Sequence, residues 1–239
     1  MNSYQNKIEL KDISKSFSDS KILDKINIEV KEGETVAILG PSGSGKSTIF
    51  NILTKTIKED SGEVLINGHI SYMYQKDMMV PWKRVIDNIG LPLLFKGKRK
   101  GEAREEVKKY LKDFGLLGYE LKYPRQLSGG MKQRANFLKT YLTSEDIMLL
   151  DEPFGALDSI TRSKMQKWLL DLKKSINSTI LLITHDIEEA IILCDKIYII
   201  SDKPAKIKKE IVVDFFKDEN LVTSKKFIKV KKEIIDLML

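Results

Sequence analysis

The stretch that decides the fold is G-P-S-G-S-G-K-S-T at residues 40–48, which fits the pattern G-x-x-x-x-G-K-[ST] at every fixed position. The apolar, β-branched run at residues 34–39 predicts a buried strand before it, and residues 49–53 start a helix after it. This order aims successive backbone N–H groups and the positive end of a helix at one point. We therefore expect the stretch to hold a polyphosphate.

Each residue type in this loop suits a nucleoside triphosphate and its metal ion. Glycine at positions 43 and 45 permits a close backbone approach that a Cβ atom would block. Lys46 is expected to reach the β- and γ-phosphates, and Ser47 to ligate Mg²⁺. The predicted nucleotide-binding residues of the loop are Gly40, Pro41, Ser42, Gly43, Ser44, Gly45, Lys46, Ser47 and Thr48.

Length and composition indicate a globular protein with one large α/β domain, or with a core and a small second lobe. The chain has 239 residues, of which 42% are hydrophobic. Its formal charge of +7 could suggest a nucleic acid or an anionic membrane as partner. The lysines, however, are scattered among glutamates, without an arginine-rich cluster or interleaved aromatic residues. We expect a solvated surface and no nucleic-acid partner.

The chain shows no pattern of a secretory signal or a membrane span. Its longest apolar runs, such as residues 180–183, are far shorter than the roughly 18 residues that a spanning helix needs. A soluble, intracellular chain is expected. Cys194 is the single cysteine and is predicted to be a small buried residue.

Apolar patterning predicts strands on both sides of a helical region. Residues 8–13 and 22–30 alternate apolar with polar residues, which is typical of half-exposed antiparallel strands. The other expected strands are residues 61–68, which end at an Asn-Gly turn, then 70–74, 147–151, 179–184 and 196–200. The expected helices are residues 102–114, 132–142 and 160–174. Residues 102–114 place Ala103, Val107, Tyr110, Leu111 and Phe114 on one face.

After the strand at residues 196–200, the sequence predicts a charged tail that ends in an amphipathic helix at residues 225–239. Its apolar side is expected to carry Phe227, Ile228, Ile234, Ile235, Met238 and Leu239. This pattern fits either a membrane-surface helix or a helix that packs on the core or at a dimer contact.

Two carboxylates close the apolar strand predicted at residues 147–151. Asp151 is expected to hold Mg²⁺, directly or through water. Glu152 is expected to orient and polarise the water that attacks the γ-phosphate. Acidic residues that merely close a strand are the simpler alternative, but the phosphate-binding loop elsewhere in the chain favours the catalytic role.

Two more polar residues follow predicted strands. Gln75 follows the strand at residues 70–74, where its carbonyl oxygen can touch Mg²⁺ or the attacking water, although for Gln75 taken alone a polar strand end is the favoured interpretation. His185 follows residues 179–184 and is placed to donate a hydrogen bond to a γ-phosphate. The predicted catalytic residues are Lys46, Gln75, Glu152 and His185, and the predicted Mg²⁺ ligands are Ser47, Gln75 and Asp151.

A second helix start in the chain also suits an anion. Ser128, Gly129 and Gly130 precede the helix predicted from residue 132 and are predicted to bind phosphate. Since only one of the two cradles contains a lysine, two chains facing each other form an economical arrangement. In that arrangement each lysine loop is completed by the other chain's Ser-Gly-Gly.

For one aromatic residue and one apolar cluster, sequence spacing alone does not decide between a core position and a binding role. Phe17 precedes the phosphate loop and is either a core residue or a platform on which an adenine ring stacks. Met78, Met79, Pro81 and Trp82 form an apolar cluster that is either core or a socket for a partner helix.

In combination these motifs resemble the ATP-binding subunits of ABC transporters. Residues 40–48 resemble Walker A, and residues 147–151 resemble Walker B. Residues 127–131 are similar to the signature motif, and residues 156–158 to the D-loop. The resemblance identifies Gln75 with the Q-loop, Glu152 with the catalytic glutamate, His185 with the switch histidine and Phe17 with the adenine-stacking aromatic. It extends over about residues 8–207.

The resemblance implies an α/β fold of the P-loop NTPase type. A mixed sheet with flanking helices carries an N-terminal antiparallel β subdomain and an inserted α-helical subdomain. The implied single ABC ATPase domain, residues 1–239, has a nucleotide-binding core at residues 1–75 and 143–207. The helical subdomain with the signature motif spans residues 76–142, and a C-terminal tail with its helix spans residues 208–239.

Finer details resemble the importer branch for nitrate, sulfonate and taurine. The segment at residues 78–89 and the element at residues 201–207 are similar to that branch, although Lys203 and Ala205 replace the usual arginine and glycine. The resemblance implies a homodimer that closes around ATP and Mg²⁺ at the cytoplasmic face of the membrane. The implied partners are a membrane permease that contacts residues 75–82 and an extracytoplasmic solute-binding protein. The alternative is a soluble ABC ATPase for Fe–S assembly, cell division or the ribosome.

Overall fold

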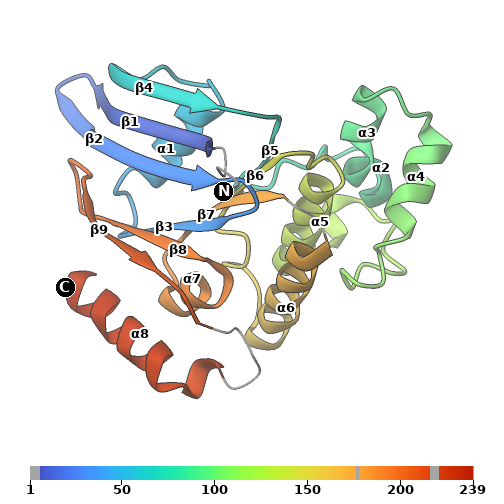
Figure 1. Cartoon of the computed structure of the whole chain (residues 1–239). Helices are drawn as coiled ribbons and strands as arrows, with labels where there is room; N and C mark the ends of the chain where they lie inside the picture. The colour runs from blue at the N-terminus through green and yellow to red at the C-terminus, as the bar shows by residue number, and fades with distance from the viewer. Residues whose placement is uncertain (1–5, 176–177, 216–220, 239) are drawn as a thin grey trace.

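The computed structural model describes residues 6–175, 178–215 and 221–238. It contains two sheets (Figure 1). β1 (Asn6–Phe17), β2 (Ser20–Lys31) and β4 (Ser61–Ile66) form an antiparallel sheet in the order β2-β1-β4. The predicted N-terminal antiparallel strands are thus confirmed.

The second sheet has six strands in the order β5-β6-β7-β3-β8-β9. Its strands are β3 (Thr35–Leu39), β5 (Ile70–Met73), β6 (Ile147–Asp151), β7 (Thr179–Thr184), β8 (Lys196–Ile200) and β9 (Ile207–Val212). The first five in this order run parallel, and β9 is antiparallel to β8. The sheet is therefore mixed, as predicted.

Both faces of the central strands are covered, which explains their uninterrupted apolar sequences. In β3, Val36 and Ile38 pack into a core shared with the antiparallel sheet and α1 (Lys46–Leu53). Ala37 and Leu39 point to the opposite face, into a core shared with the helices. The chain thus builds an α/β sandwich with two hydrophobic cores, and Cys194 is buried in the second, as predicted.

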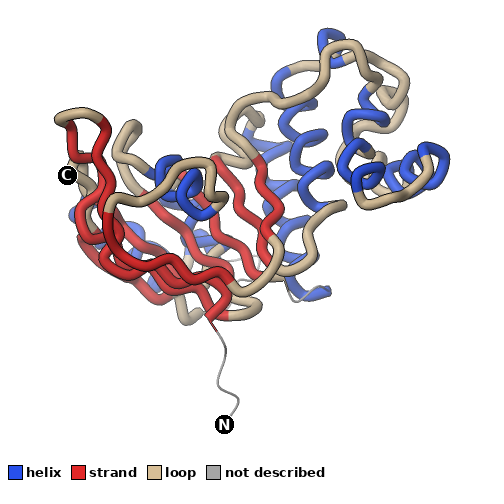
Figure 2. The backbone as a smooth tube through the Cα atoms, turned by 90° about the horizontal axis from the view of Figure 1, so that it is seen from above, coloured by secondary structure: helices blue, strands red, loops and turns tan. Residues whose placement is uncertain are grey.

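Helices occupy the sequence between β5 and β6 and project to one side of the sheets (Figure 2). They are α2 (Val85–Ile89), α3 (Leu91–Phe95), α4 (Lys100–Lys108), the 3₁₀ helix Pro124–Gln126 and α5 (Gly129–Tyr141). The later helices are α6 (Ser159–Ser175), α7 (Ile187–Leu193), the 3₁₀ helix Leu221–Thr223 and α8 (Lys225–Met238). In Figure 1, α8 lies on the side of the molecule away from α2–α4.

Two sequence-based element predictions were wrong in part. The predicted charged tail contains β9, whose exposed and polar residues gave no apolar pattern. The helix predicted at residues 102–114 ends at Lys108, and turns continue to Gly115, whose φ of 58° cannot extend a helix.

Two further details differ from the predicted patterns. α5 begins at Gly129 instead of residue 132, and the Ser128 hydroxyl accepts a hydrogen bond from the Met131 N–H as its N-cap. In α8, Phe227 and Ile234 are buried, but Ile228 and Ile235 are exposed, so the predicted apolar side is split. Leu239, also predicted on that side, lies outside the described residues.

Candidate active site

The parallel strands bring the predicted site residues to one edge of the six-stranded sheet. β3 leads into the phosphate loop, β6 into Glu152, and β7 into His185. The register aligns their ends, because Leu39 pairs with Thr184 and Asp151 with Ile183. Side chains that are far apart in the sequence meet where the strands end.

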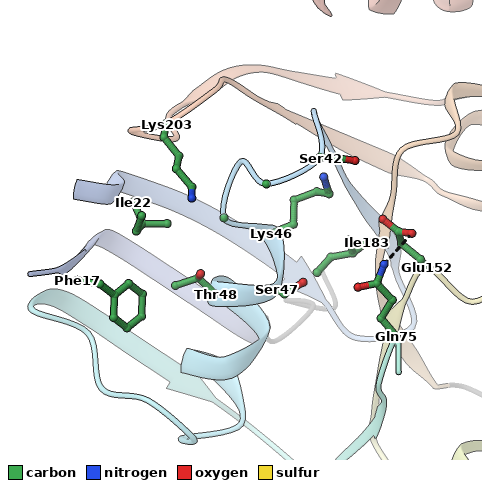
Figure 3. Close-up of a pocket in the computed structure, with 12 residues that line it drawn as sticks. Phe17, Ile22, Ser42, Lys46, Ser47, Thr48, Gln75, Glu152, Ile183 and Lys203 are labelled. Carbon is green, nitrogen blue, oxygen red and sulfur yellow. Dashed lines mark hydrogen bonds between the residues drawn. The ribbon is translucent and has the colours of Figure 1, made fainter. Parts of the chain in front are cut away.

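A cavity of about 320 Å³ opens at this edge of the sheet (Figure 3). The phosphate loop forms its floor, and residues from the antiparallel sheet and the β8–β9 turn form one wall. Its lining residues are Phe17, Ile22, Ser42, Gly43, Gly45, Lys46, Ser47, Thr48, Gln75, Glu152, Ile183 and Lys203. Phe17 is 48% exposed, so it is a surface aromatic of this cavity and not a core residue.

The phosphate loop has the geometry and chemistry of an anion cradle. Gly45 has a φ of 109°, and a Cβ atom there would lie 2.9 Å from Ile22 Cγ2, so only glycine fits. The Lys46 amine is buried and donates to the carbonyl oxygens of Gly40 and Pro41, both at 2.7 Å. Burial lowers the pKa of Lys46. The buried Ser44 hydroxyl has no hydrogen-bond partner in the described chain, which suits a loop that binds an external acceptor.

Ser47 and Asp151 meet as the predicted metal ligands. The Ser47 hydroxyl lies 3.1 Å from Asp151 Oδ2, and the Tyr72 hydroxyl donates to the same oxygen at 3.3 Å. Burial raises the pKa of the Asp151 carboxyl, while these two hydrogen bonds oppose the rise. Within the described residues, no group of three or more His, Cys, Asp or Glu side chains could hold a metal by itself.

This donor set fits Mg²⁺ bound together with a nucleotide. Mg²⁺ is typically held by one or two protein oxygens and completes its shell with phosphate oxygens and water. One hydroxyl and one carboxylate, placed beside a phosphate cradle, match that requirement. Bound there, Mg²⁺ would neutralise the charge that develops on the phosphates.

Glu152 is held between two other predicted catalytic residues, Gln75 and His185. The Gln75 amide donates to Glu152 Oε2 at 3.1 Å, and His185 Nδ1 lies 3.3 Å from Glu152 Oε1. The Glu152 backbone has a φ of 48°, a left-handed conformation that is uncommon for a residue with a side chain. The Gln75 side chain is turned toward Glu152 (Figure 3), and its predicted contact with Mg²⁺ stays a prediction.

The Ser-Gly-Gly segment does not line this cavity. Ser128, Gly129 and Gly130 stand at the start of α5 instead. A Cβ atom on Gly130 would lie 3.2 Å from Leu157 Cδ2, so this helix start packs closely on the loop that follows β6. The prediction that these residues bind a nucleotide in another chain therefore stays a prediction.

Three side chains join the site that the sequence analysis did not assign to it. Tyr72 contacts Asp151, and Lys203 lines the cavity. Gln133 of α5 donates to the Glu152 carbonyl oxygen at 2.7 Å and accepts from the Ala156 N–H at 2.8 Å. Tyr72 lies one residue before the end of β5, beside β6, so its strand position was the one available signal. Gln133 and Lys203 stand on elements whose packing no local pattern reveals.

Comparison with known proteins identifies the family in which this site occurs. The model of the ABC transporter family matches residues 23–155, which is more than half of the chain. The chain belongs to the ABC transporter family. As an ABC ATPase, it hydrolyses ATP.

Curated relatives of this ABC ATPase carry the names of import proteins. The formylaminopyrimidine import ATP-binding protein ThiZ of Halalkalibacterium halodurans is 45% identical, over 78% of this chain and 76% of the relative. The aliphatic sulfonates import ATP-binding protein SsuB of Bacillus cereus is 35% identical, over 95% of this chain and 94% of the relative. The taurine import ATP-binding protein TauB of Pseudomonas aeruginosa is 39% identical, over 81% of this chain and 77% of the relative.

A solved bacterial ABC transporter cassette with a dimeric structure is 31% identical, with a TM-score of 0.81 over 87% of this chain and all of the other. A dimeric post-hydrolysis form of that cassette, bound to ADP and phosphate, gives a TM-score of 0.79. These comparisons confirm the predicted family and fold. In the part of this ABC ATPase that the structure describes, none of the helices has the length and apolar character of a membrane span.

Proposed function

We propose that this ABC ATPase is the energising subunit of an importer that takes up a small solute through a separate membrane permease. Relatives along 95% of the chain bear the names of import ATP-binding proteins, which supports this role. The observation in the structure that carries the transport part is an exposed apolar surface beside Gln75. The subunit would then sit peripherally, at the cytoplasmic face of the membrane.

This surface consists of Met78, Pro81 and Trp82, which we call the docking segment. Trp82 is 78% exposed and Met78 is 55% exposed. Met79, also predicted in this cluster, is buried and is not part of the surface. Exposed aromatic and methionine side chains are typical of interface anchors. A coupling element of the permease is therefore the partner that we propose for it.

Hydrogen bonds and an ion pair hold the backbone around the docking segment and connect it to α5 and the catalytic residues. The buried Asn88 side chain donates to the carbonyl oxygens of Val80 and Lys83 and accepts from the Val80 N–H. Asp77 forms an ion pair with Lys132 of α5 at 3.2 Å. Because Gln75 lies three residues before Met78 of the docking segment and contacts Glu152, a change at the nucleotide can displace the surface that the permease would contact.

The proposed cycle uses two copies of the chain. Each ATP would be bound by Lys46 of one copy and by Ser128 and Gly130 of the other. The nucleotide would thus join two helix N-termini, one from each copy, that both carry partial positive charge. Gln75 would sense the bound phosphate, and His185 would donate a hydrogen bond to the γ-phosphate. Within one chain, the Ser-Gly-Gly segment is not among the residues that line the cavity, which supports this division between copies.

The hydrolysis step falls to Glu152. Its carboxylate would accept a proton from the attacking water while the water oxygen bonds to the γ-phosphorus and the bond to ADP breaks. Gln75 and His185 hold both carboxylate oxygens, so the side chain is oriented before the reaction. Loss of the bridging γ-phosphate would then allow the dimer to reopen.

The proposed solute class is small and resembles taurine, an aliphatic sulfonate or nitrate. The names of the SsuB and TauB relatives support the sulfonate and taurine members of this class. An extracytoplasmic solute-binding protein would deliver the solute. The ATPase has no contact with the solute in this arrangement, so the partner proteins must be used to test the class.

The test is to purify the tagged chain with Glu152→Gln from native membranes in detergent and to identify its partners. We expect a multi-span membrane protein at an equal molar ratio. Adding Trp82→Ala should remove that protein, whereas the matched change Ile228→Ala, on the exposed side of α8, should not. Recovery of only a soluble scaffold or ribosomal partner would refute the transport role and leave the ATPase assignment in place.

A further inference from the structure

Lys203 provides a positive charge in the cavity from the element at residues 201–207, which lies outside Walker A, Walker B, the Q-loop and the signature motif. Its side chain extends from the β8–β9 turn between Ile22 and the glycine loop (Figure 3). Among the described residues that line the cavity, the charged side chains are Lys46, Glu152 and Lys203. No hydrogen bond or ion pair engages the Lys203 ammonium in the described part of the chain, so this group is available to a ligand.

The turn that carries Lys203 is fixed to the wall of the cavity. The Ala205 N–H donates to the Ile22 carbonyl at 2.8 Å, and the Asp24 N–H donates to the Ala205 carbonyl at 2.9 Å. Ala205 is fully buried, and Lys206 pairs with Asp24 at 3.0 Å. The turn therefore adds a pseudo-strand contact to β2, which keeps residue 203 above the nucleotide cavity.

The place of Lys203 along the cavity indicates which part of a nucleotide it would meet. Gln75 and Glu152 mark the end at which the γ-phosphate reacts, and Phe17 marks the wall for the base. Lys203 lies with Ile22 on the side of the phosphate loop that is remote from Gln75 and Glu152 (Figure 3). Between the base and the γ-phosphate, a nucleoside triphosphate carries the ribose and the α- and β-phosphates, and the α-phosphate is the anionic group nearest the base.

We propose that Lys203 is a nucleotide-binding residue that contacts the ribose-proximal phosphate of the bound nucleotide. This inference rests on the proposed ATP site. The ammonium would neutralise charge at the α-phosphate, while Lys46 would contact the β- and γ-phosphates at the other end of the triphosphate. Because this contact would be equally strong in the bound ground state and in the transition state, it would raise nucleotide affinity and leave the rate of the chemical step unchanged.

The experiment compares Lys203→Met, Lys203→Arg and the wild type by calorimetric titration with Mg-ADP and by steady-state kinetics with ATP. We expect Lys203→Met to raise the Kd for ADP and the KM for ATP roughly fivefold, as for a partly exposed charge pair, with kcat unchanged. Lys203→Arg should restore affinity. The difference between methionine and lysine should shrink as ionic strength rises.

Lys206→Met is the matched control, since Lys206 belongs to the same turn but pairs with Asp24 outside the cavity. An unchanged Kd in Lys203→Met, or an equal loss in Lys206→Met, would overturn the inference. Lys46→Ala separates this failure from that of the site itself. If Lys46→Ala loses ADP affinity while Lys203→Met does not, only the role of Lys203 is wrong; normal affinity in Lys46→Ala would refute the nucleotide site as a whole.

Discussion

At the scale of single residues, the position of Glu152 accounts for the proposed chemistry. Its carboxylate lines the cavity, and Gln75 and His185 contact its two oxygens. Glu152→Gln keeps the size and a hydrogen-bonding oxygen but removes the base. We expect nucleotide affinity to be retained and turnover to fall roughly 10²- to 10⁴-fold.

Parallel measurements of ATP hydrolysis and of nucleotide affinity test this expectation. Glu188→Gln is a suitable control, because Glu188 lies on α7 and pairs with Lys231 instead of facing the cavity. Near-normal hydrolysis in Glu152→Gln would contradict the assignment of the base.

A second residue, Glu189 on α7, makes the stability of the folded state depend on pH. Its side chain is buried, Oε1 has no hydrogen-bond partner within the described chain, and burial together with Asp186 raises its pKa from 4.5 to about 8. The folded state therefore keeps a proton that the unfolded state releases above pH 4.5. Stability conferred by this proton is fully present below pH 4.5 and is lost as pH rises toward about 8.

Glu189→Gln mimics the protonated acid and should remove this pH dependence. We expect the melting temperature of the wild type to fall more steeply between pH 5 and pH 8 than that of the variant, with the larger gain from the substitution at pH 8. Thermal unfolding of both, with Glu188→Gln as the surface control, measures the effect. Parallel pH profiles of Glu189→Gln and the wild type would show that Glu189 is ionised in the folded protein.

At the scale of elements, the fully buried strands could be predicted and the edge of the sheet could not. β3, β6 and β7 are apolar at nearly every position because both of their faces are covered, and this pattern is visible in the sequence. β9 is an edge strand with mostly exposed residues, so its formation depends on pairing with β8. The local sequence of β9 therefore gives no signal from which that pairing could be predicted.

The same distinction applies to the site. Glu152 and His185 directly follow buried strands, so their place at the sheet edge follows from the sequence. Tyr72 touches Asp151 across 79 positions of sequence, and Gln133 reaches Glu152 across 19. Such contacts result from packing of whole elements, and only a structure reveals them.

Gln133 leads to a prediction about α5 and the loop after β6. Its amide bridges the Glu152 carbonyl oxygen and the Ala156 N–H, so α5 holds the backbone on which the base stands. Gln133→Met should break both hydrogen bonds and lower kcat roughly 10- to 100-fold through misplacement of Glu152. Affinity for ADP should persist, since Gln133 does not line the cavity.

Kinetics and ADP titration of Gln133→Met check this split between kcat and affinity. Asn136→Ala on the same helix serves as the control, because its side chain makes no hydrogen bond in the described chain. A full kcat in Gln133→Met would show that the bridge does not position the base.

At the scale of the whole molecule, the two helix starts that are predicted to bind phosphate lead to a test of the proposed dimer. If each ATP needs Lys46 from one copy and Ser128 from the other, Lys46→Ala and Ser128→Arg should each be inactive alone. A mixed dimer of the two variants has one composite site with both wild-type residues and one with neither. Equal mixing makes half of the dimers mixed, so activity should return to about a quarter of the wild-type value if the sites act independently.

Two measurements make the result decisive. Mixing should be monitored by ATP hydrolysis together with sedimentation, which reports whether dimers form. Ser128→Arg alone should bind ADP normally, because Ser128 does not line the cavity of its own chain. No recovery in mixtures that do form dimers would mean that the two chains do not share their sites. Hydrolysis by Ser128→Arg alone would mean that the Ser-Gly-Gly segment acts only as the N-terminal cap of α5.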